Sequence, residues 1–188
     1  MKYKLAFLLF LMVSFVYGQG NYRISNYSLV IKGTSNLHDW ECKVNEVRAY
    51  GAMTADAGGL KSINALNVEI PVKTIKSTKG SIMDNKMYNA LKADAYANIN
   101  YKLEKVNGMN QRGGGYDINT TGYLTIAGST KKIDLYVYGQ MGSDQSITFK
   151  GSKKFKMTDY SVSPPTALMG TLTTGDEVEV VFQVTLKQ

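Results

Sequence analysis

Apolar and polar residues alternate along much of the chain. In residues 178–186 every second residue is apolar, and most of the residues between them are polar. Successive side chains of a β-strand point to opposite faces, so this alternation predicts a strand with one buried face. Alternation and other strand-like runs together predict strands over residues 27–32, 40–53, 66–70, 99–103, 116–126, 133–138, 146–150, 153–158 and 177–187.

Turns and two irregular segments divide these strands. Glycine-containing turns that suit antiparallel hairpins are found at residues 57–59, 107–115, 128–129 and 142–144. Residues 81–93 instead carry apolar side chains at the spacings of a short amphipathic helix: Ile82, Met83, Met87, Tyr88 and Leu91. Residues 161–175 contain two adjacent prolines and are predicted to form a loop.

These elements predict an all-β protein, an antiparallel β-barrel of about eight strands with one short helix. Strand length favours a barrel over a sandwich. At ~3.3 Å per residue, the strand predicted over residues 177–187 spans about 36 Å, which exceeds the common strand of five or six residues. A closed barrel of this size either fills with its own side chains or holds one small ligand.

The first 18 residues have the pattern of a secretory signal peptide. Lys2 and Lys4 precede an apolar run that extends from Leu5 to Val16. This run is shorter than the ~20 residues of a membrane-spanning helix. We therefore expect a signal peptide over residues 1–18, one barrel domain over residues 19–188, and a periplasmic or secreted location. Cys42 is the only cysteine, which excludes an intramolecular disulfide.

The charge pattern argues against a nucleic-acid partner. The formal net charge is +7, and removal of Lys2 and Lys4 leaves +7 − 2 = +5. The lysines are scattered along the chain rather than clustered with aromatic residues, so no nucleic acid is expected. Modest positive charge is compatible with transient contact with an anionic membrane surface.

The sequence offers little for catalysis or metal binding. His38 is the only histidine, and no Gly-x-Ser-x-Gly motif provides a nucleophile for a His38–Asp39 pair. We expect His38 and Asp39 to form local hydrogen bonds in a turn, and Glu69 and Asp84 to be solvated charges rather than a glycosidase pair. One His and one Cys do not supply the usual zinc ligands. A non-enzymatic protein with no cofactor and no metal is expected, although a hydrolase or isomerase that uses His38 is an alternative.

Several segments occur in a characteristic order: Gly33-Thr34-Ser35-Asn36-Leu37-His38-Asp39-Trp40, residues 70–77 with residues 83–92, residues 122–132, and residues 157–160 followed by Pro164, Pro165 and Gly170. In this order they resemble the YceI-like family, whose members are polyisoprenoid-binding, lipocalin-like barrels. The resemblance covers nearly all of the chain after residue 18. Many members carry Arg-Asp where this chain has Met83-Asp84, so the ionic contact of that Arg is absent here.

The resemblance implies an exported barrel with a long apolar pore, an isoprenoid or other long-chain lipid as its ligand, and often a homodimer. Alternation then selects the strand residues expected to line the pore: Leu66, Val68, Ile70, Ile99, Tyr101, Leu103, Leu124, Ile126, Leu135, Phe149, Val180, Phe182 and Val184. The helix is expected to add Met83, Met87 and Tyr88, and His38 and Trp40 are placed at the pore mouth. The alternative is a structural or stress-response partner protein whose barrel is filled by its own side chains.

Overall fold

The computed structural model describes residues 19–188, so the predicted signal peptide lies outside the described residues. The strands are β1 (Gln19–Ser35), β2 (Trp40–Val44), β3 (Arg48–Asp56), β4 (Gly59–Pro71), β5 (Ile75–Ser77), β6 (Asn98–Arg112), β7 (Gly115–Ile126), β8 (Ser129–Met141), β9 (Ile147–Lys156), β10 (Thr166–Ala167) and β11 (Leu172–Lys187). The described residues also form one α-helix, α1 (Ser81–Ala90), and three 3-10 turns, η1 (Val72–Thr74), η2 (Met157–Tyr160) and η3 (Leu168–Gly170).

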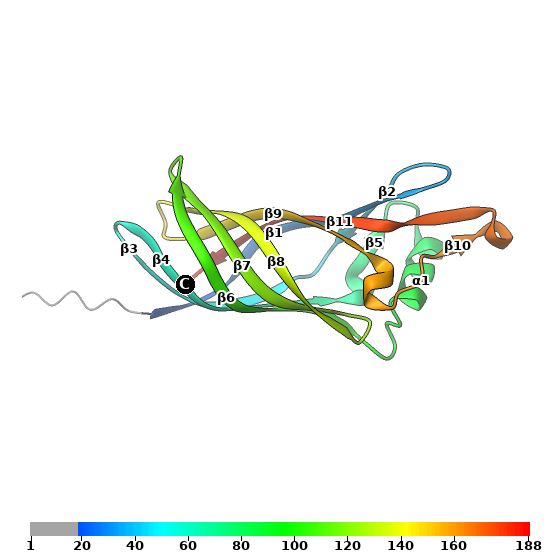
Figure 1. Ribbon diagram of the computed structural model, residues 1–188, viewed down its shortest axis with the longest axis horizontal. Coiled ribbons are helices and arrows are strands. Elements are labelled where there is room, and N and C mark those ends of the chain that lie inside the picture. The colour runs from blue at the N-terminus through cyan, green and yellow to red at the C-terminus, as the bar shows by residue number, and fades with distance from the viewer. Residues whose placement is uncertain (1–18) are drawn as a thin grey trace, which may run out of the picture.

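Eight antiparallel strands close into a barrel, in the order β1, β3, β4, β6, β7, β8, β9 and β11. Pairing of β11 with β1 closes the ring, from Arg23 opposite Lys187 to Ser35 opposite Thr174. The strands β2 and β5 extend the sheet beside the second half of β1, and the short β10 pairs with the start of β11. The predicted all-β barrel with one short helix is therefore confirmed (Figure 1).

The two ends of the barrel differ. The β3–β4 and β6–β7 hairpins lie at one end, and α1, β5 and β10 lie at the other (Figure 1). The hairpin end is closed by a cluster of fully buried apolar side chains: Met53, Leu60, Ile118, Ile147 and Leu186. Two smaller clusters lie toward the helix end, one around Ile75 and one around Tyr160. We refer to the two ends as the hairpin end and the helix end.

Two strand predictions were wrong in their boundaries. The strand predicted over residues 40–53 is interrupted, because the Asn45 amide donates to the Thr74 carbonyl and Val47 is buried among apolar side chains. The separate strands predicted over residues 146–150 and 153–158 are one strand, β9. Gly151 lies within this strand. A larger residue would not fit there, because the space where its side chain would lie is occupied by the ring of Phe182.

Other boundaries shift for local reasons. The loop predicted over residues 161–175 contains β10 and η3, and its last residues begin β11. The helix predicted over residues 81–93 ends at Ala90, and Lys92 adopts a positive φ of 53° in the turn that follows. The turn predicted over residues 107–115 is shorter, because β6 continues to Arg112.

Candidate functional site: an apolar cavity open at the helix end

A cavity of about 300 Å³ occupies the barrel between the buried cluster at the hairpin end and the helix end. One face of β11 illustrates how the strands build it. Val178, Val180, Phe182, Val184 and Leu186 all line the cavity, whereas Gln183 is exposed. The period-two alternation of the sequence therefore becomes the inner wall of the barrel.

The structure brings nearly all of the predicted pore residues to this cavity. The predicted residues that line it are Leu66, Val68, Ile70, Met83, Met87, Ile99, Tyr101, Leu103, Leu124, Ile126, Leu135, Phe149, Val180, Phe182 and Val184, together with His38 and Trp40. Because Ser35, Lys79 and Pro165 line it as well, the cavity extends to the segments that surround the helix end. We refer to this region as the mouth.

Tyr88 is the one predicted pore residue that does not line the cavity. Its hydroxyl lies 2.8 Å from the Ile75 carbonyl oxygen and 2.9 Å from that of Lys73, and it accepts a hydrogen bond from Lys76 Nζ at 2.7 Å. These bonds turn the side chain toward η1 and β5. Tyr88 thus fastens α1 to the sheet, and its placement in the pore was wrong.

Polar groups deep in the cavity are bonded within the protein. The Thr120 hydroxyl donates to the Leu135 carbonyl at 2.9 Å, and the Tyr101 hydroxyl lies 3.4 Å from Thr120 Oγ1. Burial raises the pKa of Tyr101, which keeps its phenol neutral. A polar ligand would find few free partners in this region of the barrel.

The charged residues in the lining are all lysines. Lys79 and Lys86 line the cavity near α1, and Lys153 lines it from β9, whereas no Asp or Glu of residues 19–188 does so. Lys153 lies where β8 and β9 separate: the two strands pair from Val137 opposite Gly151 to Met141 opposite Ile147. Beyond that point Lys153 Nζ donates to the Asp134 carbonyl at 2.9 Å, so this lysine spans the gap between the two strands.

His38 forms the local bonds that the sequence predicts, and they do not constitute a catalytic triad. The His38 Nδ1 atom lies 2.9 Å from the Asp39 carbonyl oxygen, and the Ser35 hydroxyl donates to the His38 carbonyl rather than to the ring. The side chain of His38 is exposed. Within residues 19–188, no cluster of three His, Cys, Asp or Glu side chains is arranged to hold a metal ion.

The comparisons with known proteins agree with this architecture. Residues 23–186 match the YceI-like domain family. The chain belongs to the YceI-like family. Comparison with the curated proteins gives no match. No helix formed by residues 19–188 of this YceI-like chain is long and apolar enough to span a membrane.

Solved structures share the YceI-like fold at low sequence identity. BcnA of Burkholderia cenocepacia is 18% identical with a TM-score of 0.64, over 85% of this chain and 95% of that one. A polyisoprenoid binding domain from Saccharophagus degradans, implicated in plant cell wall breakdown, is 13% identical with a TM-score of 0.68, over 90% and 99% of the two chains. The YceI protein of Campylobacter jejuni is 21% identical with a TM-score of 0.60, over 78% and 84%.

Several lining residues of the YceI-like barrel were missed by the sequence reasoning. Ile133 and Val137 are in phase with Leu135 on β8, so strict use of the alternation would have found them. Cys42 and Tyr160 also line the cavity, and no periodic pattern marks either residue. Burial, followed by the nearby Asp84 charge, raises the pKa of the Cys42 thiol to about 11.

The family's Arg-Asp position is occupied in this YceI-like chain by Met83-Asp84, and Asp84 has a structural role. The prediction that Asp84 is a solvated charge was wrong, since its side chain is only 9% exposed. The Ser77 amide donates to Asp84 Oδ1 at 2.7 Å, and Lys76 Nζ lies 3.5 Å from Oδ2. Glu69 instead pairs with Arg48 at 2.7 Å, so the two carboxylates do not act together.

Proposed function

We propose that this YceI-like protein is an exported binding protein that holds an elongated apolar lipid, of polyisoprenoid type, and catalyses no reaction. The observation that carries the proposal is the cavity itself. It runs from the mouth into the barrel, its strand-derived wall is almost entirely hydrocarbon, and the Thr120 hydroxyl deep within it is already bonded to a carbonyl.

The physical basis of binding is burial of apolar surface. Each Å² of apolar surface removed from water contributes about 25 cal/mol, and this contribution has no preferred direction. A long flexible chain can therefore bind through many weak contacts along the wall. Met83 and Met87, which line the cavity from α1, have adaptable side chains that suit such a ligand.

The relatives support the isoprenoid class of ligand. The Saccharophagus degradans protein with this fold is described as a polyisoprenoid binding domain. The proposal of export rests on the signal-peptide pattern of residues 1–18, and the proposed location is the periplasm or the outside of the cell. The open cavity counts against the alternative of a structural protein whose barrel is filled by its own side chains.

Native mass spectrometry tests the proposal. Protein purified gently from the exported fraction should carry extra mass, and organic extraction should release a lipid with a prenyl chain. Val180→Trp fills the cavity and should abolish the extra mass. Val181→Trp is the matched control, because Val181 is 36% exposed and faces outward. Lipid-free wild-type protein that also fails to take up added polyprenol would reject the proposal.

A further inference from the structure

Three large aliphatic side chains stand exposed around the mouth. Leu37 is 71% exposed, Ile82 is 74% exposed and Met169 is fully exposed at 108%. They come from three different segments, namely the β1–β2 loop, the first turn of α1, and η3. Among the residues whose burial the structure describes, 19–166 and 169–188, Val181 is the only other exposed large aliphatic residue, so this kind of exposure is concentrated at one end.

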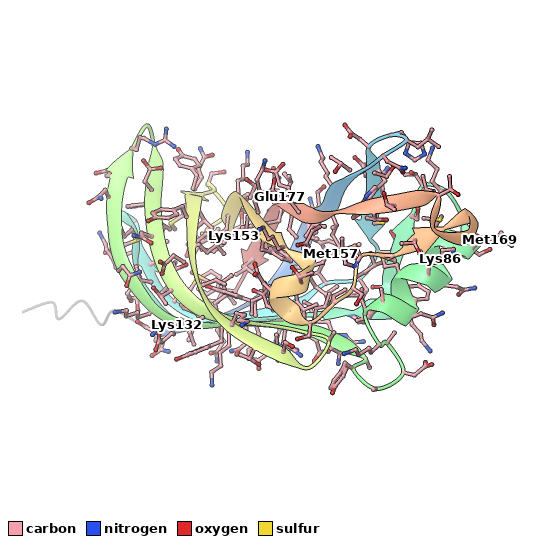
Figure 2. The ribbon with its side chains drawn as sticks, turned by 45° about the vertical axis from the view of Figure 1, so that its right-hand side comes forward. Lys86, Lys132, Lys153, Met157, Met169 and Glu177 are labelled. Carbon is pink, nitrogen blue, oxygen red and sulfur yellow. The ribbon has the colours of Figure 1, made fainter. Side chains whose placement is uncertain are left out.

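Hydrogen bonds hold the three segments next to one another. The Asn36 side-chain amide donates to the Thr171 carbonyl at 2.8 Å, and the Thr173 amide donates to Asn36 Oδ1 at 3.0 Å. Lys86 Nζ of α1 donates to the Thr166 carbonyl at 3.0 Å, which joins the helix to β10. Figure 2 shows Lys86 and Met169 together at this end. Leu37, Ile82 and Met169 are therefore three apolar tips on a connected rim, which we call the apolar rim.

The apolar rim borders the opening of the cavity. His38 lies next to Leu37 and lines the cavity, Met83 lies next to Ile82 and lines it, and Leu172 lines it two residues after Gly170. The three tips themselves point away from the lining. Whatever covers the tips therefore lies directly over the passage into the barrel.

The lining at the mouth carries two lysines, and the exposed Asp39 lies between the lining residues His38 and Trp40. Lys79 and Lys86 line the opening, and in residues 19–188 neither has a carboxylate within ion-pair distance. Residues 19–188 carry the formal charge +7 − 2 = +5 that remains without Lys2 and Lys4. A surface with basic residues beside exposed apolar side chains suits an anionic bilayer, where both kinds of contact are favourable.

The three apolar tips by themselves offer little area for a stable protein partner. At ~25 cal/mol per Å² and 1.5–3 kcal/mol per buried Leu, Ile or Met, each tip offers about 60–120 Å². A stable protein interface takes about 800 Å² from each partner, and more than half of that area is apolar, so the tips alone supply less apolar area than such an interface contains. Three separate tips can instead insert between lipids at the surface of a bilayer without forming a continuous interface.

We propose that the apolar rim is a docking surface for an anionic phospholipid bilayer. Leu37, Ile82 and Met169 insert at the interface, and Lys79 and Lys86 face the anionic head groups. The proposal rests on the lipid-binding function proposed above and deepens it: docking places the mouth against the bilayer, so that apolar cargo moves between membrane and cavity without crossing water.

Vesicle flotation tests the apolar tips. The probe is a vesicle of mixed phosphatidylcholine and phosphatidylglycerol, and the variant is Leu37→Ser, Ile82→Ser and Met169→Ser combined. Its vesicle affinity should fall at least tenfold, which corresponds to about 1.4 kcal/mol. The control combines Tyr50→Ser, Tyr136→Ser and Val181→Ser, which removes exposed apolar side chains from the outer barrel wall and should leave the affinity unchanged.

The lysines provide an independent arm. Lys79→Gln with Lys86→Gln should weaken binding to the anionic vesicles about fivefold per lysine, which corresponds to ~1 kcal/mol each. On vesicles of pure phosphatidylcholine the same pair should have little effect. Lys131→Gln with Lys150→Gln, at exposed positions on β8 and β9, is the control.

Three results would overturn the docking surface. The first is that the triple-serine variant binds vesicles as well as the wild type does. The second is that the triple-serine variant and its control lose the same affinity. The third is that the triple-serine changes convert a lipid-free dimer to a monomer. The last result would assign the rim to a second copy. If vesicle binding depends on the apolar rim but the protein takes up no lipid, the proposed lipid-binding function is wrong and the docking surface stands.

Discussion

The indole ring of Trp40 lies over Gly33, its partner in the register between β1 and β2. A side chain at residue 33 would overlap the ring atoms of Trp40. The indole Nε1 donates to the Thr34 carbonyl at 2.8 Å, which fixes the ring in this position at the mouth. A glycine on one strand thus makes the space for an aromatic ring on the next.

Gly33→Ala should therefore displace Trp40 and cost about 1–3 kcal/mol of stability, the usual range for overpacking. Trp40 is the only tryptophan, so its fluorescence reports the displacement directly. Urea unfolding measures the loss of stability. Gly108→Ala is the control, because no atom lies within 4 Å of the added carbon. Equal unfolding midpoints for the two variants would contradict the packing of Trp40 on Gly33.

The phase of β11 gives a prediction about ligand binding. Phe182 lines the cavity and Gln183 faces solvent. Phe182→Asp places a carboxylate in an apolar site and should abolish binding of a prenyl-chain probe, whereas Gln183→Asp should change affinity less than about threefold. Fluorescence titration with a labelled polyprenol measures both, after circular dichroism has verified folding. Similar losses in the two variants would exclude the cavity as the binding site.

Cys42 provides a chemical probe of the cavity. A rise of its pKa from 9.0 to about 11 lowers the thiolate fraction at pH 8 about a hundredfold. Alkylation of Cys42 by iodoacetamide should therefore be slower than that of an exposed cysteine by at least this factor. The alkylation rate should increase about tenfold per pH unit until the pH reaches the pKa of the thiol. Because Cys42 lines the cavity, bound lipid should slow the reaction further. A rate that ignores added lipid would indicate that the thiol reacts by another route.

Asp144 should make stability depend on acid pH. Hydrogen bonds from the Ser146 hydroxyl and amide, and then from Lys187, lower its pKa from 3.8 to about 2. A carboxyl group with a lowered folded-state pKa stabilises the protein above pH ~4, and this contribution is lost as pH falls toward 2. Asp144→Asn should therefore lower the urea midpoint at pH 7 and have a much smaller effect near pH 2. Ser143→Ala in the same turn should show no such pH dependence.

The strands and their inward faces could be predicted because sheet alternation is local information. Every strand residue predicted to face the interior lies on the cavity wall, from Leu66 on β4 to Val184 on β11. Tyr88 could not be placed in this way, because helical spacing does not reveal that a phenol will bond to the carbonyls of residues 73 and 75. The break at Asn45 depends on Thr74, nearly thirty residues away, so it left no local pattern.

The site was harder to predict where it depends on several segments. Asp84 is buried because a strand amide and Lys76 converge on it from β5, and such convergence is a property of the folded chain. The mouth likewise joins residues as distant as Asn36 and Thr173. Single-residue patterns report burial within one element, whereas contacts between elements emerge only from their packing.

The pairing of β1 with β11 also determines when the chain can fold. Ser25 donates to the carbonyl of Thr185, 160 residues later, so the ring stays open until its last strand has left the ribosome. At 5–20 residues per second, synthesis of the 188 residues takes roughly 10–40 s. Such long-range closure gives a high contact order and slow folding. The nascent chain therefore cannot complete its barrel while it is being made, which would keep it unfolded for the export proposed above.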